Sequence, residues 1–312
     1  MSYDAVLVLS FGGPEGPDDV MPFLRNVVGN RVPEERLRKV AAHYDHFGGV
    51  SPINERTAEL ADALRVKLAE DGPALPVYWG NRFWRPLLSD TLERMRDDGV
   101  KRAVAFCTTA LSSPAGCRNY FDDIVASRAK VEGAPVIDKI RPFALREGYV
   151  ETCVARLREA LSELDGDDPP HVFFSAHSIP SEMAEGCDYE REMQALGVMV
   201  AERCGIANWR IVYQSRSGRP GTPWLEPDVC DALEELERGA SVIVAPFGFV
   251  ADHMEVVWDL DEEARAKAEE LGLRFVRART ANAHPTFVQL VRDLVAERLE
   301  KGPAPCPPDC CS

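Results

Sequence analysis

One apolar segment of this chain ends abruptly in a histidine flanked by small side chains: Phe173-Phe174-Ser175-Ala176-His177-Ser178-Ile179-Pro180. A second apolar segment ends in a carboxylate: Pro246-Phe247-Gly248-Phe249-Val250-Ala251-Asp252-His253-Met254-Glu255. Buried parallel strands are nearly continuous apolar runs, and open α/β sheets bind their ligands beyond the carboxyl ends of such strands. The two segments therefore predict a parallel sheet that presents His177 and Glu255 at one functional edge.

Short apolar strands alternate with amphipathic helices along the rest of the chain, a pattern typical of parallel sheets covered on both faces. We expect strands at residues 5–10, 77–80, 103–106, 171–175, 209–214 and 241–245. We expect helices at residues 33–44, 55–70, 87–98, 149–164, 190–203, 227–238 and 285–300. The sequence thus predicts an α/β protein with two doubly wound, Rossmann-like domains at residues 1–148 and 149–284, followed by a cysteine-rich tail at 301–312.

Composition narrows the classes of function. The 312 residues are 45% hydrophobic and carry a formal net charge of −15, which argues against nucleic acid as a general partner. No apolar stretch approaches the ~18 to 20 residues of a membrane span, and no signal-peptide pattern opens the chain. We expect a cytoplasmic monomer without a transmembrane segment. The nine cysteines favour reduced thiols or metal ligands over a disulfide framework.

His177 has two readings. A single histidine after an apolar run is more often a hydrogen-bonded structural residue than a catalytic one. Ser175 and Ser178 give it polar surroundings at a strand end, however, and an imidazole near its reference pKa of ~6.5 can accept a proton at neutral pH.

Glu255 begins a row of carboxylates at intervals of four, continued by Asp259 and Glu263. An acidic, solvated helix face is the plain alternative. The apolar residues around Glu255 argue against that alternative at the start of the row. A spacing of four aligns side chains along a helix, and a locally widened π turn would align them better. Hard oxygen ligands of this kind suit a divalent cation.

Several further motifs, together with the two strand ends, resemble those of the ferrochelatase family. They are Leu9-Ser10-Phe11-Gly12-Gly13-Pro14, Gly48-Gly49-Val50-Ser51-Pro52-Ile53-Asn54, Tyr213-Gln214-Ser215-Arg216 and Gly221-Thr222-Pro223-Trp224-Leu225. The motifs occur in the family's order and cover about residues 3 to 300, which a single short pattern would not do. The resemblance implies the chelatase fold, with a porphyrin cleft between the domains and the helix at 285–300 packed on the first domain.

The resemblance also implies roles for the residues at the two strand ends. His177 would be the base that removes pyrrole protons, or a transient iron ligand. Glu255, Asp259 and Glu263 would form a path for Fe²⁺ or for protons. Phe11 departs from the pattern, because some bacterial ferrochelatases have an iron-binding tyrosine there. Phenylalanine cannot ligate iron, so we expect Phe11 to be an aromatic wall against the macrocycle.

Substrate carboxylates need hydrogen-bond donors. The candidates for contacts to porphyrin propionates are Arg25, Arg31, Ser51, Asn54 and Tyr120. The arginines would make charge-assisted contacts and the other residues neutral hydrogen bonds. Each arginine also has a plain reading as a solvated helix residue.

The last candidate is the tail, where Cys306, Cys310 and Cys311 lie close together. A tetrahedral all-cysteine site, for Zn²⁺ or an iron–sulfur cluster, needs a fourth thiolate. Some ferrochelatases hold a [2Fe-2S] cluster with one internal cysteine and a C-terminal trio, which implies Cys153 as the internal ligand. A reactive tail that binds no metal is the alternative.

The expected function is insertion of Fe²⁺ into a porphyrin with release of two protons, a lyase reaction of haem biosynthesis. The cysteine tail and the Ser-Phe-Gly-Gly-Pro start resemble the actinobacterial branch, which favours coproporphyrin III as the substrate. The alternatives are a protoporphyrin IX ferrochelatase, a cobalt chelatase of the same fold and a non-catalytic porphyrin or haem carrier.

Overall fold

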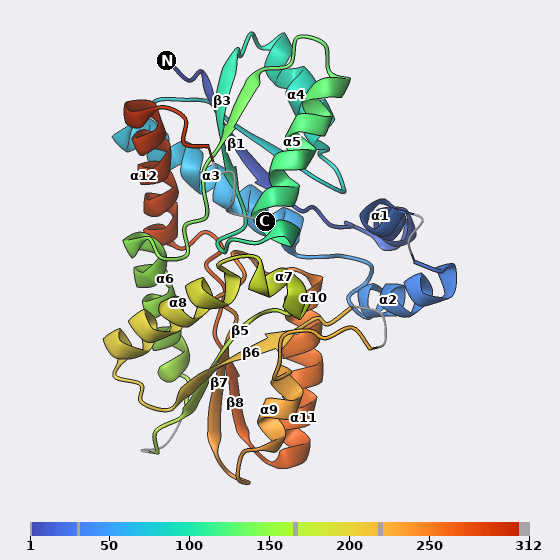
Figure 1. Ribbon diagram of the computed structural model, residues 1–312, viewed down its shortest axis with the longest axis vertical. Coiled ribbons are helices and arrows are strands. Elements are labelled where there is room, and N and C mark those ends of the chain that lie inside the picture. Colours follow the sequence, from blue (N-terminus) through green and yellow to red (C-terminus); the bar gives the residue numbers. More distant parts are fainter. Residues whose placement is uncertain (1, 30–31, 165–167, 218–220, 306–312) are drawn as a thin grey trace. The chain divides into compact units, whose positions relative to one another are not determined.

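The computed structural model describes residues 2–29, 32–164, 168–217 and 221–305. The chain forms two compact units (Figure 1). Unit 1 consists of Met1–Thr108, Asn119–Arg141 and Val288–Pro305. The described part of unit 2 consists of Thr109–Arg118 and Pro142–Phe287. Each unit is built around its own parallel sheet.

The sheet of unit 1 contains β1 (Ala5–Ser10), β2 (Val77–Asn81), β3 (Arg102–Cys107) and β4 (Val136–Lys139). Its strand order is β2-β1-β3-β4 with every neighbouring pair parallel, and Val8 lies opposite Trp79 on one side and Phe106 on the other. All residues of β1 are buried, as expected for a central strand covered on both faces. The chain reverses its direction of winding at β1, which makes the sheet doubly wound.

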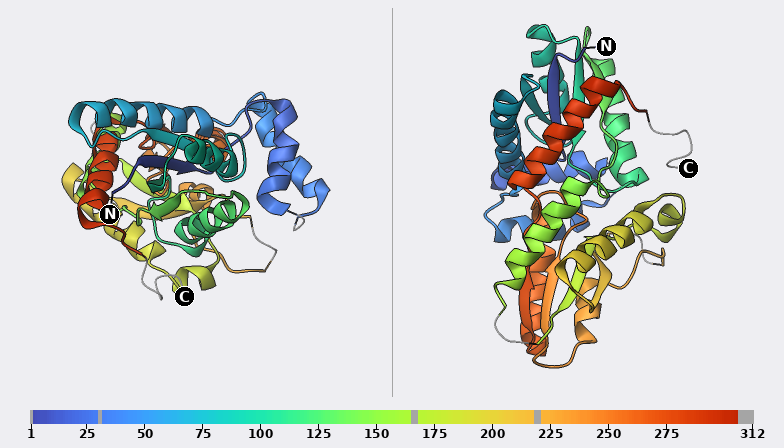
Figure 2. Two further views of the ribbon diagram at one scale, coloured as in Figure 1. Left: turned by 90° about the horizontal axis from the view of Figure 1, so that it is seen from above. Right: turned by 90° about the vertical axis from the view of Figure 1, so that its left-hand side faces the viewer.

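Helices cover both faces of this sheet (Figure 2). They are α3 (Ile53–Asp71), α4 (Leu88–Asp97), α5 (Asn119–Lys130) and the larger part of α12 (Pro285–Lys301), whereas α1 (Pro17–Val28) and α2 (Glu34–His46) pack against each other to one side of the sheet. Leu7 and Leu9 of β1 join one core cluster with Leu92 of α4 and Ile124 of α5. Strand side chains alternate between faces, so the intervening β1 residues point to the other face, which α3 covers.

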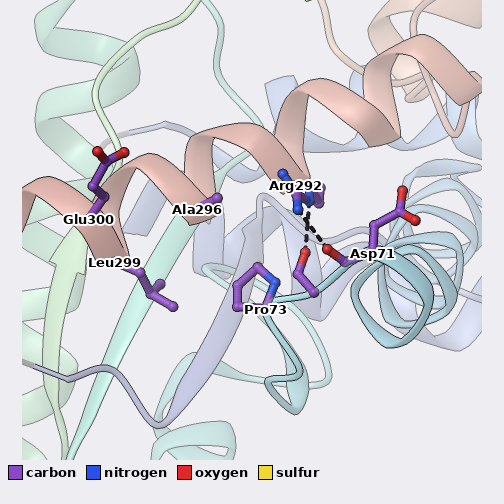
Figure 3. Close-up of a pocket in the computed structure, with 7 residues that line it drawn as sticks. Asp71, Pro73, Arg292, Ala296, Leu299 and Glu300 are labelled. Atoms are coloured by element: carbon purple, nitrogen blue, oxygen red, sulfur yellow. Dashed lines mark hydrogen bonds between the residues drawn. The ribbon is translucent and has the colours of Figure 1, made fainter.

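An arginine of α12 binds the end of α3. Arg292 donates from Nε to the Gly72 carbonyl at 2.7 Å and from Nη2 to the Asp71 carbonyl at 2.6 Å, at the edge of a surface pocket also lined by Pro73 and Leu299 (Figure 3). The last carbonyls of a helix lack intrahelical partners, and Arg292 supplies them. This contact ties the C-terminal helix to unit 1.

The sheet of unit 2 repeats the topology of the first sheet. It contains β5 (His171–His177), β6 (Trp209–Gln214), β7 (Ser241–Ala245) and β8 (Arg274–Arg277), in the parallel order β6-β5-β7-β8. Its other elements are π-helix η2 (Pro114–Arg118), α6 (Glu147–Leu161), α7 (Ser181–Glu185), α8 (Tyr189–Cys204), α9 (Val229–Glu234), α10 (Met254–Val256), π-helix η3 (Val257–Ala264) and α11 (Arg265–Leu271).

The two faces of this second sheet carry different helices. Phe173 and Val244 form one core cluster with Leu233 of α9 and with Val256 and Leu260 of the α10–η3 segment. Gly197 of α8 lies against the opposite face, where a Cβ atom would come within 2.8 Å of Trp209 and 3.2 Å of Phe174. The α10–η3 segment is therefore anchored to the sheet by its apolar residues, and its carboxylates lie on the side of the segment that does not join this core cluster.

The predicted α/β class with two doubly wound parallel sheets is confirmed, and every expected strand is present. The sequence did not indicate the edge strands β4 and β8, because each is short and mixes charged with apolar residues, as edge strands commonly do. The helix expected at 227–238 is shorter, since Asp228 caps it by accepting from the Cys230 amide and Val229 begins it. Within the described residues, no helix is both long and apolar enough to cross a membrane.

Candidate active site

His177 is the last residue of β5, and its ring is held in a defined orientation. Its Nδ1 contacts the Ser178 carbonyl, and the Tyr189 hydroxyl donates to the His177 carbonyl at 2.9 Å. A carbonyl only accepts hydrogen bonds, so Nδ1 carries a proton in both charge states of the ring. Nε2 is consequently the atom that gains or loses a proton. The side chain is 31% exposed, so Nε2 remains accessible to a substrate.

Glu255, the second residue of α10, places its Oε2 3.7 Å from the Nε2 of His177. Burial of the ring alone would lower the pKa of His177, but the Glu255 carboxylate outweighs it and raises this pKa to about 9. The surrounding protein would raise the pKa of Glu255, but the imidazolium charge lowers it. About half of the Glu255 side chain, 52%, is exposed, so water screens the pair and keeps its energy small. At neutral pH the two groups form an imidazolium–carboxylate pair.

The row that starts at Glu255 continues in a π-helix, as the spacing suggested. Asp259 and Glu263 both lie in η3, whose turns are wider than those of an α-helix. Glu263 accepts a hydrogen bond from the Trp258 indole at 2.8 Å, and its negative charge and that of Glu255 act on Asp259. The structure therefore brings the predicted carboxylates onto one segment.

Asp259 is the carboxylate whose environment is most altered. Burial raises its pKa to about 7, helped by the charges of Glu255 and Glu263 and opposed by hydrogen bonds from Ser215 and Gln214. Ser215 donates its hydroxyl to Oδ2 of Asp259, and the Gln214 amide donates to the same atom at 3.4 Å. A carboxyl with a pKa near 7 can accept and release protons at physiological pH.

Sequence reasoning assigned no role to Gln214 and Ser215. The buried Gln214 side chain accepts from Ser175 at 2.9 Å and donates to the Glu255 carbonyl at 2.9 Å, so it connects β5 and β6 to the acidic segment. Ser215 has φ of 62°, in the left-handed region that side chains other than glycine rarely adopt. Backbone strain of this kind clusters at functional sites. The sequence did mark both residues, because they belong to the Tyr213-Gln214-Ser215-Arg216 motif at the end of β6.

His253 was also missed, although it lies inside the second motif. Its Nδ1 is 3.9 Å from Oε2 of Glu255, and its ring contacts Phe249 with centroids 5.1 Å apart. Burial lowers the pKa of His253, and the neighbouring His177 lowers it further against the pull of Glu255. His253 is thus neutral at pH 7 and flanks the same carboxylate oxygen as His177.

Phe11 of unit 1 follows β1 and contacts Phe83, with ring centroids 4.7 Å apart. The guanidinium of Arg82 lies 5.7 Å from the Phe11 ring centroid and 4.6 Å from that of Tyr120. Arg82 also pairs with Asp123 at 2.5 Å, and its side chain is only 7% exposed. An arginine that sequence reasoning did not single out thus holds two of the predicted substrate residues together.

The polar candidates of unit 1 differ in what they can still bind. Tyr120 is buried, with its hydroxyl 3.3 Å from Thr108 Oγ1. The Asn54 amide exchanges hydrogen bonds with both backbone groups of Gly13, accepts from Asn81 and donates to the Arg85 carbonyl. These contacts use its hydrogen-bonding capacity, so Asn54 shapes the Gly13 turn. Ser51 is buried beside the same turn, where a Cβ on Gly13 would lie 2.9 Å from its hydroxyl.

The remaining candidates are only partly within the described residues. Arg25 pairs with Glu34 at 2.7 Å, and both side chains are largely exposed. Arg31 lies outside the described residues. Cys153 lies on α6 and is 2% exposed, and burial raises the pKa of its thiol well above the ordinary value. Cys306, Cys310 and Cys311 lie outside the described residues.

Among the residues that the structure describes, no three histidine, cysteine, aspartate or glutamate side chains are grouped closely enough to hold a metal ion. The His177–Glu255 pair and the carboxylates behind it therefore do not form a closed metal cage. Their chemistry is that of an open site, with one base, a carboxylate beside it and a second carboxyl that titrates near neutrality. Such a site can take protons from a substrate and contact a cation in passing.

Comparisons with known proteins agree on one family. Residues 3–299 match the Ferrochelatase family. The chain is 47% identical to the ferrochelatase of Rhodopirellula baltica, over 99% of this chain and 93% of that protein. It is 48% identical to the coproporphyrin III ferrochelatase of Streptomyces coelicolor, with coverage of 95% and 85%, and 46% identical to that of Mycolicibacterium smegmatis, with coverage of 98% and 95%.

The chain belongs to the ferrochelatase family. The predicted enzyme class, a metal chelatase, is thereby confirmed. Solved structures agree on the fold at low identity. The sirohydrochlorin chelatase SirB from Bacillus subtilis subspecies spizizenii, in complex with cobalt, aligns with a TM-score of 0.60 at 12% identity over 97% of both chains. CbiX, the terminal enzyme of siroheme biosynthesis in denitrifying bacteria, aligns with a TM-score of 0.54 at 12% identity, over 95% of this chain and 99% of its own. This ferrochelatase therefore has the chelatase fold.

Proposed function

We propose that this ferrochelatase inserts Fe²⁺ into coproporphyrin III, releasing two protons. The observation that carries the proposal is the pairing of His177 Nε2 with Glu255 at the start of a π-helical row of carboxylates. Metallation requires a base for the pyrrole N–H protons and oxygen ligands for the arriving cation. In unit 2, β5 supplies the base and the α10–η3 segment supplies the oxygen ligands.

The order of events follows from the charges. With Glu255 ionised, His177 is protonated at neutral pH and cannot act as a base. An Fe²⁺ ion that reaches Glu255 neutralises the charge that stabilises the imidazolium, so the pKa of His177 falls and Nε2 gives up its proton. The base thus becomes available when the metal arrives. Neutral Nε2 can then accept a pyrrole proton.

Released protons need an exit. Asp259, with a pKa of about 7, can accept a proton and release it, and Glu263 lies further along the same π-helix. We assign to Glu255, Asp259 and Glu263 the path of Fe²⁺ inward and protons outward. His253 stays neutral beside Glu255 and restricts where that carboxylate can move.

The preference for coproporphyrin III rests on the names of the Streptomyces and Mycolicibacterium relatives. A porphyrin with four propionates needs more hydrogen-bond donors than one with two propionates. The predicted porphyrin contacts remain Phe11, Arg25, Arg31, Ser51, Asn54 and Tyr120. Since the Asn54 amide is already engaged, we expect it to act through the Gly13 turn. A cytoplasmic, monomeric state stays a prediction.

Anaerobic incubation of the purified protein with Fe²⁺ and each free porphyrin, followed by absorbance, tests this proposal. Coproporphyrin III should be metallated with a higher kcat/KM than protoporphyrin IX. Equal or reversed efficiencies would defeat the coproporphyrin assignment and leave the chelatase assignment standing. Co²⁺ in place of Fe²⁺ tests the cobalt alternative, and porphyrin binding without metallation by any of these ions would indicate a carrier.

We also propose that the tail binds a [2Fe-2S] cluster through Cys153, Cys306, Cys310 and Cys311. Cys153 fits such a role, because it is shielded from water on α6 and metal coordination deprotonates a thiol despite a raised pKa. A cluster would tie the tail to α6. Protein purified anaerobically should contain about two irons and two sulfides per chain, and Cys153→Ser should remove them. One zinc per chain, or no metal, would replace this proposal with a zinc site or an unliganded tail.

A further inference from the structure

Arg277, the last residue of β8, binds two carboxylates that lie on either side of Glu255 and Asp259 in the chain. It donates from Nε and Nη2 to the two oxygens of Asp261, at 2.9 and 2.7 Å, and from Nη1 to Oδ1 of Asp252 at 3.1 Å. The side chains of Arg277, Asp252 and Asp261 are 12%, 15% and 27% exposed. The contact to Asp261 is the planar, two-point pairing in which arginine cannot be replaced by lysine.

The two aspartates bracket Glu255 and Asp259 in the chain. Asp252 precedes the short α10 helix that carries Glu255, and Asp261 lies in η3 between Asp259 and Glu263. The segment after β8 holds Asp252 further, since Thr280 donates to its Oδ1 at 3.0 Å and the Asp252 amide donates to the Asn282 side chain at 3.1 Å. The chain on both sides of Glu255 and Asp259 is therefore fastened to β8 and to the residues that follow it.

We propose that Arg277 is a positioning residue of the metal path. By binding Asp252 and Asp261 together it fixes the register of the α10–η3 segment, so that Glu255 and Asp259 face the substrate side, and it withholds the two bound carboxylates from the metal. The inference rests on the proposed function, because it assigns to Arg277 the alignment of the same acidic row.

The neighbouring charges support this distinction between the carboxylates that Arg277 binds and those that remain for the metal. Asp252 and Asp261 are both paired with Arg277, whereas Glu255 and Asp259 contact no lysine or arginine among the ion pairs of the described residues. Incoming Fe²⁺ thus meets carboxylates that no arginine or lysine of the described residues holds, because the charged partner of Glu255 is the imidazole ring of His177. Losing Arg277 would release two more carboxylates into the row and loosen its geometry.

A purely structural role for Arg277 predicts different results from a positioning role. Changing one partner of a buried ion pair destabilises the protein in either role, so loss of stability alone would not distinguish the two roles. Groups that orient metal ligands typically cost 10- to 100-fold in metal affinity when they are changed. The positioning role therefore predicts a rise in the KM for metal while the KM for porphyrin stays constant.

The test uses Asp261→Asn and Arg277→Lys in the full chain. Asp261→Asn keeps the side-chain size and leaves the Arg277–Asp252 pair, so it is the variant more certain to fold. Arg277→Lys keeps the charge but cannot bind both oxygens of Asp261 and reach Asp252 at once. The matched control is Arg265→Gln, because Arg265 approaches Asp261 from an exposed position at 4.0 Å.

We expect the KM for Fe²⁺ to rise at least about tenfold in both variants, with the KM for coproporphyrin III within about twofold of wild type. Amide hydrogen exchange without metal should quicken in Val257–Ala264 and stay unchanged in β5. The control should match wild type in all three measurements. An unchanged KM for Fe²⁺ with unchanged exchange in Val257–Ala264, in variants that fold, would overturn the inference. Failure of the proposed function is distinguishable, because the wild-type protein itself would then insert no metal while the exchange comparison could still be made.

Discussion

The Nε2 atom of His177 lies 3.7 Å from Oε2 of Glu255, while the other ring nitrogen of His177 contacts the Ser178 carbonyl. One nitrogen is thereby committed to the backbone, and the other forms an ion pair with a carboxylate. The carboxylate that we propose as a metal ligand therefore controls the protonation state of the proposed base.

Removing the Glu255 charge should lower the pKa of His177. In Glu255→Gln the carboxylate that raises this pKa is absent and burial of the ring remains, so the pKa should fall from about 9 to 6.5 or lower. Titration of the His177 ring by NMR in the metal-free protein measures it. Glu263→Gln, further along the row, should leave the value nearly unchanged. A pKa that stays near 9 in Glu255→Gln would show that another group protonates the ring.

The pair should also give a pH dependence to the free energy of unfolding. The folded-state pKa of His177 is raised, so its contribution is fully present below about 6.5 and is lost as pH rises through about 9. Because the Glu255 side chain is half exposed, the contribution should be about 1 kcal/mol or less. Urea unfolding of wild type and Glu255→Gln at pH 6 and pH 10 should show a difference only at pH 6. A larger difference at pH 10 would contradict the assigned charge states.

Ser215 should set the pH at which Asp259 titrates. Its hydrogen bond lowers the pKa of Asp259 against the effect of burial, so Ser215→Ala should raise that pKa above 7. The acidic limb of the kcat/KM profile against pH should move to higher pH. Ser215→Gly also removes the hydroxyl but relieves the left-handed backbone, and should give the same displacement. Different pH profiles for these two variants would show that backbone strain at residue 215, and not loss of the hydroxyl, changes the pKa of Asp259.

Tyr120→Phe should raise the KM for coproporphyrin III and leave the KM for Fe²⁺ unchanged, if the hydroxyl contacts a propionate. The ring should stay in place, because Arg82 packs against it and the residue is buried. Steady-state kinetics with each substrate varied in turn provides the measurement. Thr108→Val, which removes the hydroxyl partner of Tyr120, serves as a control for the internal hydrogen bond. An unchanged porphyrin KM in Tyr120→Phe would limit Tyr120 to a packing role.

The ends of the central strands could be predicted from sequence because they are encoded locally. β5 is an apolar run that stops at His177, and β7 is an apolar run that ends at Ala245, from which a loop leads to Glu255 on α10. Their neighbouring positions in the sheet bring His177 and the Glu255 segment to one edge. The four-residue spacing of the carboxylates likewise indicated a helix, and the structure shows that its turns at Asp259 are the wide turns of a π-helix.

The groups that tune this site could not be predicted in the same way. Gln214 and Ser215 reach Asp259 only because β6 pairs with β5, and Arg277 reaches Asp261 only because β8 lies beside β7. Arg82 contacts Phe11 and Tyr120, and the three residues come from three separate segments of unit 1. Such contacts depend on tertiary pairing. The motif at residues 213–216 marks Gln214 and Ser215 but does not show what they contact, and nothing in the local sequence distinguishes Arg82 or Arg277 from surface arginines.

The most direct test of the account is anaerobic metallation of coproporphyrin III by His177→Ala, compared with wild type and with porphyrin binding measured in parallel. The porphyrin should still bind, because its affinity comes from ring burial and carboxylate contacts. The rate of Fe²⁺ insertion should fall by more than about 100-fold, the low end for loss of an acid–base group. Insertion at a rate close to that of wild type would remove His177 from the mechanism and contradict the central claim.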